Sequence, residues 1–364
     1  LVAGTVLLGG IGHREAQALE GRERLVGERE RDVRADLVRR RQVDGHFLVK
    51  LVEQRTLHHL TGGTGIFNFQ TLGDLRARLE TEWSNDALRL TVRGDALYDD
   101  YTSDSGIEFR DLNVQLSPAD KVDLKIGRQI LTWGTGDLVF LNDLFPKSWV
   151  SFFSGRDDDY LKAPSDAVRV TWYPGSINVD IAWSPSFDPD EYLTGERFSF
   201  FLPPAGMVVA PRPKLAGLEP DNRVDNSELA VRLFRTVGST EYAAYLYRGF
   251  FKRPLGVNEA LQPIFPALSV YGASLRRPLR QGLFNAEIAW HDSRDDAAGD
   301  NPLIPNSQLR LLVGYEFEAA PRFNVGLQYY LESTLDYGSL LGTSLTPSLP
   351  SLVTPPILIL VKSL

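Results

Sequence analysis

Alternation of apolar and polar residues dominates the chain from Leu75 to Leu331 and constrains its fold more than any other feature. The clearest case is the segment 121–130, in which Val122, Leu124 and Ile126 alternate with charged residues or glycine. A period of two places successive side chains on opposite faces of a β-strand. Each such segment therefore predicts a strand with one apolar and one polar face, and we expect an all-β protein.

Twelve candidate strands occur between about Asn68 and about Leu331, and the links between them alternate between short and long. The short turns are expected at 84–86, 117–120, 174–176, 237–240, 278–282 and 319–322. The longer links are expected at 99–106, 133–164, 185–226, 252–267 and 292–308. Antiparallel strands joined in this way have all short turns at one end and all long loops at the other, as in an up-and-down outer-membrane barrel.

The composition of the two strand faces separates a membrane barrel from a soluble β-sandwich, whose apolar faces pack against each other. Here the polar faces carry arginines interspersed with acidic residues. Tryptophans such as Trp83, Trp172 and Trp290 lie near the strand ends, as in the aromatic girdles at the two membrane interfaces. We therefore predict an antiparallel up-and-down transmembrane β-barrel in the bacterial outer membrane, in contact with its lipid.

The bulk composition excludes several other classes. A net charge of −8 gives no basic surface for nucleic acid. The mean hydropathy of −0.17 is compatible with a barrel, because only alternate strand residues face lipid. No run of 18 apolar residues predicts a transmembrane helix. The absence of cysteine excludes disulfides and thiolate chemistry.

The two ends of the chain lack the regular alternation of apolar and polar residues. We expect residues 1–66 to be a non-barrel segment, helical or disordered, residues 67–332 to form the barrel, and residues 333–364 to be an atypical tail. If the short turns are periplasmic, the first and the twelfth candidate strands both have their outer ends on the opposite side of the membrane. Both termini can then reach the periplasm only if one more strand precedes the first and one more follows the twelfth. We therefore expect the twelve strands to belong to a barrel of about 14 to 16 strands or more.

The motif Gly127-Arg128-Gln129, followed by Trp133-Gly134, resembles a poorly characterised family of bacterial outer-membrane porin-like proteins. The resemblance covers about residues 70–332. It implies a β-barrel in which this strand precedes a long inward loop, and it implies passive or selective transport across the outer membrane.

The period of two also assigns residues to the lipid and to the lumen. Apolar residues expected to point outward are Leu88, Leu90, Val92, Val122, Leu124, Ile126, Leu311, Val313, Val325 and Leu327. Charged residues expected to line a pore are Arg89, Arg93, Asp123, Lys125, Arg128, Arg169, Arg232, Glu287 and Arg310. Both signs occur throughout, so the lining predicts no clear preference for anions or cations.

The segment 134–161 is too apolar for a loop in water and is expected to fold into the lumen and constrict it. Irregular backbone at membrane depth is tolerated only inside protein or beside a water-filled cavity. Gly134 and Gly136 would allow the sharp re-entry, and Arg128 is expected to pair with Asp137, Asp143 or the run 157–159. The residues expected to form the constriction are Asp137, Phe140, Phe145, Trp149, Phe152, Phe153 and Asp157.

No catalytic motif is present, so we expect a channel for small solutes rather than an enzyme, without cofactor or metal. The acidic run Asp157-Asp158-Asp159 could hold Ca²⁺, but a solvated loop is the simpler interpretation. A non-conducting barrel that docks around a partner protein is the second functional class, and an outer-membrane surface enzyme is the third. The sequence leaves the solute and the oligomeric state open.

Overall fold

The computed structural model describes residues 45–62, 65–85, 88–202, 207–321, 323–343, 352–353 and 358–363. The part of the expected N-terminal segment that spans residues 1–44 lies outside these ranges. None of the helices within the described ranges has the length and apolar character needed to cross a membrane.

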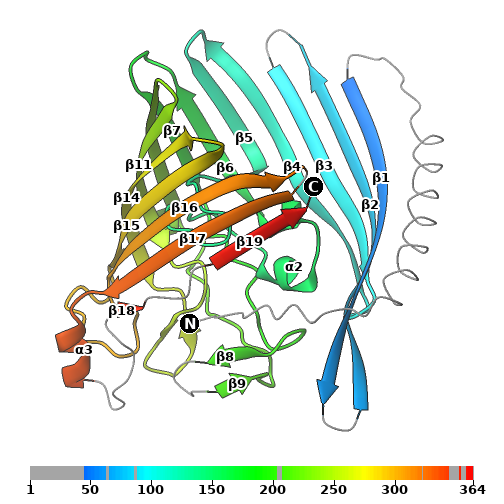
Figure 1. Cartoon of the computed structure of the whole chain (residues 1–364), viewed down its shortest axis with the longest axis vertical. Coiled ribbons are helices and arrows are strands. Elements are labelled where there is room, and N and C mark those ends of the chain that lie inside the picture. The colour runs from blue at the N-terminus through cyan, green and yellow to red at the C-terminus, as the bar shows by residue number, and fades with distance from the viewer. Residues whose placement is uncertain are drawn as a thin grey trace.

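One curved antiparallel sheet forms most of the molecule (Figure 1). Its strands follow one another in chain order, and β18 and β19 both pair with β17. The strands are β1 (Gly45–Gly62), β2 (Gly65–Ser84), β3 (Leu88–Asp99), β4 (Asp104–Ala119), β5 (Val122–Ile130), β6 (Pro164–Trp172), β7 (Asn178–Ser184), β10 (Glu228–Val237), β11 (Thr240–Phe250), β14 (Ala267–Leu279), β15 (Gly282–Ser293), β16 (Gln308–Ala320), β17 (Phe323–Thr334), β18 (Leu352–Val353) and β19 (Leu358–Ser363).

The twelve strands predicted from the alternation correspond to β2–β7, β10, β11 and β14–β17. Every neighbouring pair among them is antiparallel. Because neighbouring strands are antiparallel and their links alternate in length, the short turns among these twelve strands lie at one end of the sheet and the long loops at the other. The short turns within β2–β7 are at the top of Figure 1. The predicted up-and-down topology is therefore confirmed.

The sheet extends further at both ends than the expected segment boundaries. Gly45–Gly62 forms β1, which pairs with β2 along its length, so the expected non-barrel segment 1–66 is wrong for these residues. Leu358–Ser363, in the expected tail, forms β19 beside β17. Both strands contain consecutive apolar residues, such as Leu48-Val49 and Leu358-Ile359, which hide a period of two.

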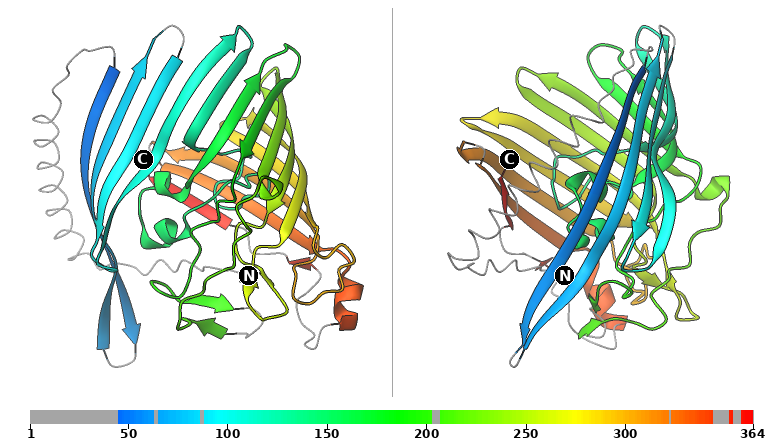
Figure 2. Two further views of the ribbon diagram at one scale, coloured as in Figure 1. Left: turned by 180° about the vertical axis from the view of Figure 1, so that it is seen from behind. Right: turned by 90° about the vertical axis from the view of Figure 1, so that its right-hand side faces the viewer.

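These strands occupy the positions that the parity of the twelve strands requires, one before the first and one after the last. Within the described residues, β1 pairs only with β2, and β19 pairs only with β17. The sheet therefore follows the barrel plan without closing, as Figure 2 also shows.

The two faces of the sheet differ in the way that the alternation predicts. β11 shows this clearly, because buried and exposed residues alternate from Tyr242 to Gly249. On the convex face Ile126 and Leu327 are 45% and 37% exposed, whereas Gln328 on the concave face is 3% exposed. Large apolar side chains are exposed over the convex face, among them Trp83, Trp172, Trp183, Leu233, Tyr271, Ile288 and Trp290.

The remaining elements belong to the long loops. The link between β5 and β6 contains α2 (Trp149–Ser154) and the short 3-10 helix η1 (Asp158–Leu161). The link between β7 and β10 contains β8 (Phe200–Leu202), β9 (Met207–Val209) and the 3-10 helix η3 (Val224–Asn226). Elsewhere lie β12 (Gly256–Val257), β13 (Pro263–Ile264) and, after β17, α3 (Tyr337–Thr343).

Ile288 provides a test of the outward face, because it lies in the middle of β15 and is 45% exposed. Replacement by arginine places a charge in lipid and should reduce the free energy of unfolding by about 2–4 kcal/mol. The measurement is urea unfolding of the protein folded into phospholipid vesicles.

Ile288→Ala is the matched control, and it should cost much less because lipid fills the space that the side chain leaves. Equal stability of Ile288→Arg and the unaltered protein would show that this face does not contact lipid.

Candidate functional site

The loop between β5 and β6, residues 131–163, lies on the concave side of the sheet and is called the inner loop below (Figure 2). It contacts strands on both sides of the curve. Gly134 has a φ of 79°, which favours glycine, and a Cβ on Gly136 would lie 2.1 Å from the carbonyl oxygen of Val139. Both glycines therefore permit the sharp turn into the interior.

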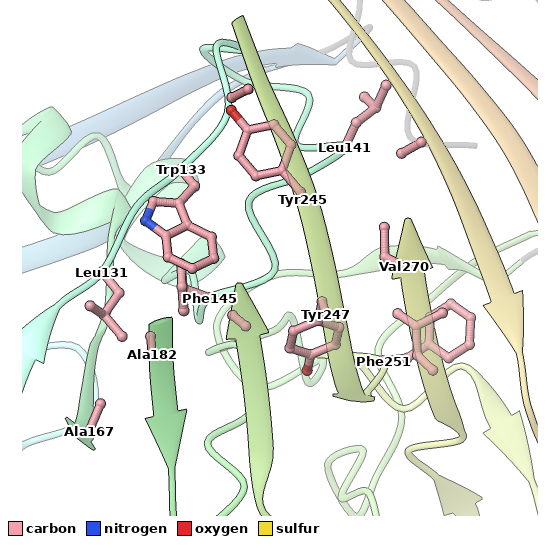
Figure 3. Packing of buried hydrophobic residues seen from close by; sticks show 14 of the residues in the cluster. Leu131, Trp133, Leu141, Phe145, Ala167, Ala182, Tyr245, Tyr247, Phe251 and Val270 are labelled. Atoms are coloured by element: carbon pink, nitrogen blue, oxygen red, sulfur yellow. The ribbon is translucent and has the colours of Figure 1, made fainter. Parts of the chain in front are cut away.

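Apolar residues of the inner loop pack on a floor of small wall residues. Leu131, Trp133 and Phe145 are buried in one cluster, and the Trp133 and Phe145 rings meet edge to face at 5.0 Å (Figure 3). The wall contributes one buried alanine from each of five strands, namely Ala167, Ala182, Ala230, Ala243 and Ala289. These five residues, the alanine floor, let the loop approach the wall closely.

Glu287 on β15 fastens the first turn of the inner loop. Its carboxylate accepts hydrogen bonds from the backbone N–H groups of Thr135 and Gly136, the latter at 3.0 Å, and from the side-chain amide of Asn142 at 2.9 Å. His291, further along β15, forms a 3.0 Å hydrogen bond with the carbonyl oxygen of Leu141. Glu287 is thus on the inner face, as predicted, but it is buried and holds the loop.

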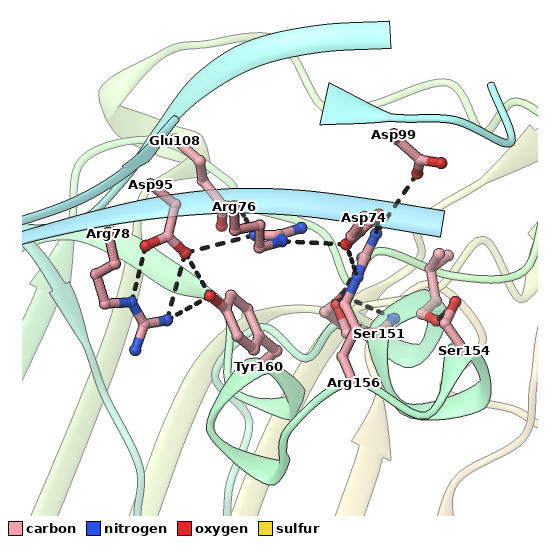
Figure 4. A network of polar contacts seen from close by, with 12 residues as sticks. Asp74, Arg76, Arg78, Asp95, Asp99, Glu108, Ser151, Ser154, Arg156 and Tyr160 are labelled. Atoms are coloured by element: carbon pink, nitrogen blue, oxygen red, sulfur yellow. Dashed lines mark hydrogen bonds and ion pairs between the residues drawn. The ribbon is translucent and has the colours of Figure 1, made fainter. Parts of the chain in front are cut away.

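The opposite wall holds the end of the inner loop through Tyr160 (Figure 4). The Tyr160 hydroxyl donates to Asp95 on β3 at 2.6 Å and accepts from Arg78 on β2 at 2.5 Å. Arg78 also donates to Asp95 at 2.8 Å. Guanidinium groups of Arg76, Arg78 and Arg110 lie within 4.9 Å of the Tyr160 ring centroid, close enough for cation–π attraction.

Two more arginines connect the loop to this wall. Arg156, which follows α2, donates to Asp74 on β2 at 2.7 Å. Arg110 on β4 donates to the carbonyl oxygens of Asp159 and Lys162 at 2.7 and 2.9 Å. The inner loop is therefore bound to β2–β4 at one side and to β15 at the other, so it crosses the interior.

A buried ion-pair cluster stiffens the loop itself. The Asp143 carboxylate contacts the Lys147 ammonium at 3.0 Å and the Lys162 ammonium at 2.9 Å, and it accepts from Thr132 at 2.8 Å. Burial alone would raise the pKa of Asp143, but the two ammonium groups outweigh burial and lower it below the ordinary value. Asp143 is therefore a carboxylate at neutral pH.

Most predicted pore-lining cations lie on the concave face and are neutralised there. The ion pairs are Arg89–Glu82, Arg93–Asp111, Arg169–Asp180, Arg232–Glu241 and Arg310–Glu332. Asp123 accepts a hydrogen bond from Ser117 at 2.7 Å. Lys125 occupies the same face of β5 as Asp123, by its position in the strand. The wall thus carries both charge signs in matched pairs.

Arg128 does not line the interior. It shares the face of Ile126, on the convex side, and its guanidinium contacts Asp166 on β6 at 3.3 Å and the Phe109 carbonyl at 2.8 Å. Gln129, the next residue along β5, is the buried one. The predicted pairing of Arg128 with the loop acids is therefore wrong, because the strand period places Arg128 on the other face.

The residues expected to form the constriction have distinct contacts, some within the loop and some with other parts of the chain. Phe140 packs over the Lys147 and Lys162 ammonium groups, Phe145 is buried, and Asp157 caps η1. The remaining contacts are Asp137 with Gln328 at 3.4 Å, Trp149 with Asp190 at 2.9 Å, Phe152 with Phe153 at 5.2 Å between centroids, and Phe153 with Phe198 at 6.4 Å.

The fastening residues Asp74, Arg76, Arg110, Arg156 and Tyr160 were not predicted as site residues. Asp74 precedes the alternating run, Arg110 lies at the β-bulge between β3 and β4, and Arg156 and Tyr160 lie in irregular backbone. A single sequence contains no periodic signal for such contacts. Among the described residues, no group of three or more histidine or acidic side chains is placed to hold a metal ion.

Comparison with known proteins shows no family for this chain. No family model and no curated protein matches the chain. Similar solved structures include OmpT, an outer membrane protein of Vibrio cholerae (TM-score 0.43, 13% identity, 81% of this chain and 78% of that one). An anion-selective porin from Comamonas acidovorans (0.42, 9%, 80% and 80%) and Salmonella typhi OmpF (0.42, 7%, 80% and 79%) are also similar.

These similarities are too low to argue for a function. The antiparallel order, the apolar convex face and the polar concave face independently define the fold as that of a bacterial outer-membrane β-barrel, with an unclosed sheet. The chain is thus a porin-like barrel in architecture.

Glu287→Ala tests the fastening of the inner loop. The change leaves three donors without their acceptor, and each charge-assisted hydrogen bond contributes about 1.5–3 kcal/mol. We expect faster hydrogen exchange of the Thr135 and Gly136 amides and faster proteolysis within the loop. Glu241→Ala, which removes a wall carboxylate that binds Arg232, is the control and should leave the loop protected.

Acidification provides a second test of the loop. Because the pKa of Asp143 is lowered in the folded protein, its stabilising effect is fully present above the ordinary value of about 4 and is lost as pH falls through the lower folded-state value. Loop protection should therefore decrease in strongly acidic solution. Asp143→Asn should show less protection at neutral pH and a smaller further loss on acidification.

Proposed function

We propose that the protein is a porin-like channel of the bacterial outer membrane through which small solutes pass, narrowed by the inner loop. The observation that carries this proposal is that one loop crosses the concave side and is bound to both walls, by Glu287 on β15 and by Asp95 and Asp74 on β2–β3. A loop held in this way narrows the passage at a fixed position and does not act as a mobile plug.

The properties of the two faces support a water-filled interior. The convex face exposes aromatic and aliphatic residues suited to lipid, and the concave face carries paired arginines and carboxylates suited to water. Because the cations of the wall are paired with carboxylates, we expect weak selectivity between anions and cations.

A barrel that docks around a partner protein is less well supported, because the chain's own loop occupies the interior that a partner would enter. We also propose a non-enzymatic role. His291, on the concave face of β15, is buried and bonded to the Leu141 carbonyl oxygen, which engages it in holding the loop. These arguments favour transport over both alternatives.

Deletion of residues 138–153 tests the channel proposal. The deletion removes α2 and the aromatic part of the inner loop while leaving β5 and β6, so the passage should widen. We expect a larger single-channel conductance in planar lipid bilayers, with an unchanged β-sheet circular dichroism spectrum.

Deletion of residues 258–261, an exposed tip of another long loop, is the matched control and should not change the conductance. Absence of channels in the intact protein would contradict the channel function. Unchanged conductance after deletion of 138–153 would show that the constriction lies elsewhere.

A further inference from the structure

A polar cavity lies between the inner loop and the wall formed by β2–β4, with a volume of about 250 Å³. The wall contributes Arg76, Arg110 and Glu108, and the inner loop contributes Ser148, Ser151 and Arg156. Pockets for drug-sized ligands measure roughly 300–1,000 Å³. This cavity therefore suits a smaller solute, about the size of one sugar ring.

The cavity is lined by three guanidinium groups and four carboxylates, most of which have partners within the protein: Arg76, Arg110 and Arg156, and Asp99, Asp104, Glu108 and Glu191. Arg76 pairs with Asp74 at 3.1 Å and with Glu108 at 3.4 Å. Arg156 contacts Asp74 at 2.7 Å and Asp99 at 3.5 Å. A charged solute would therefore be repelled by a like charge beside each group that attracts it. A neutral solute would not be repelled in this way.

Hydrogen-bonding groups are dense in this small space. The Ser148 hydroxyl donates to the Glu191 carboxylate and lies 2.7 Å from the Ser151 hydroxyl. Arg156 donates to the Ser151 hydroxyl at 3.0 Å (Figure 4). Thr102 adds a hydroxyl-bearing side chain from the link between β3 and β4. Each hydroxyl group can both donate and accept.

Arg110 supplies a donor that the described protein does not use. Its side chain is 2% exposed, and its Nε atom has no hydrogen-bond partner among the described residues. A buried donor without a partner is costly. This Nε atom has almost no accessible surface, so a solute in the cavity would meet other atoms of the Arg110 side chain.

We propose that this cavity is a binding subsite for a neutral polyhydroxylated solute of monosaccharide size. The proposal rests on the proposed channel function, for which it names the solute class. Guanidinium–carboxylate pairs and neighbouring hydroxyl groups present both donors and acceptors, which match the hydroxyl groups of a sugar. The site lies at the long-loop end of β3 and β4, so a solute would meet it at one mouth of the passage.

Equilibrium binding to the purified full chain in detergent tests the subsite independently of conductance. Glucose, glucuronate and glucosamine serve as neutral, anionic and cationic probes of similar size, and calorimetry reports their affinities. We expect saturable binding with glucose preferred. Thr102→Trp, which fills the cavity without removing an ion pair, should weaken glucose binding at least about tenfold, equivalent to about 1.4 kcal/mol.

Ser105→Trp is the matched control, because Ser105 pairs with exposed Tyr98 and does not line the cavity. It should bind glucose as the unaltered protein does. Glu108→Gln removes one of the four carboxylates that line the cavity and should shift the preference toward glucuronate.

Preference of the unaltered protein for glucuronate or glucosamine would overturn the proposed solute class. Absence of glucose binding, or equal binding by Thr102→Trp, would overturn the subsite. Binding is measured without a membrane, so the two proposals are tested separately. Absence of glucose binding would not contradict the channel function, and absence of conductance would not change the interpretation of the binding measurement.

Discussion

The need to satisfy irregular backbone inside a sheet that contacts lipid governs this structure. Strands satisfy their N–H and C=O groups by pairing, but a loop at the same depth has no such partners. Glu287 meets this need for Thr135 and Gly136, and Arg110 meets it for two carbonyl oxygens near the end of the loop. Both ends of the loop are thus fixed by charged wall residues rather than by loop sequence alone.

Charge pairing on the concave wall follows from the same requirement. A guanidinium or carboxylate removed from water needs a partner of opposite charge. Arg78 and Asp95 are paired across β2 and β3, and Arg169 and Asp180 across β6 and β7. Such pairs leave hydrogen-bonding capacity at the surface of the lumen without a large net charge, which is why a neutral, hydrogen-bonding solute suits it.

The sequence predicts the strands better than the site. A period of two identified twelve strands and their antiparallel order, and parity indicated one strand beyond each end. β1 was missed because Leu48-Val49 and similar pairs interrupt the period. The inward course of the inner loop was predicted from its apolar residues. Its contact with the wall through Tyr160 and Asp95 joins residues 65 positions apart and depends on tertiary structure. Arg128 was misplaced because its charge was given more weight than its position in the period.

The alanine floor has a consequence for the size of the opening. The loop rests on methyl groups from five strands, so its distance from the wall is set by the volume of those wall residues as much as by the loop. A larger residue at Ala230 or Ala243 would displace the loop toward the axis of the sheet, since packed interiors leave little free space. The width of the opening therefore depends on the wall residues as well as on the loop. A substitution in the wall, far from the loop in sequence, can narrow the opening.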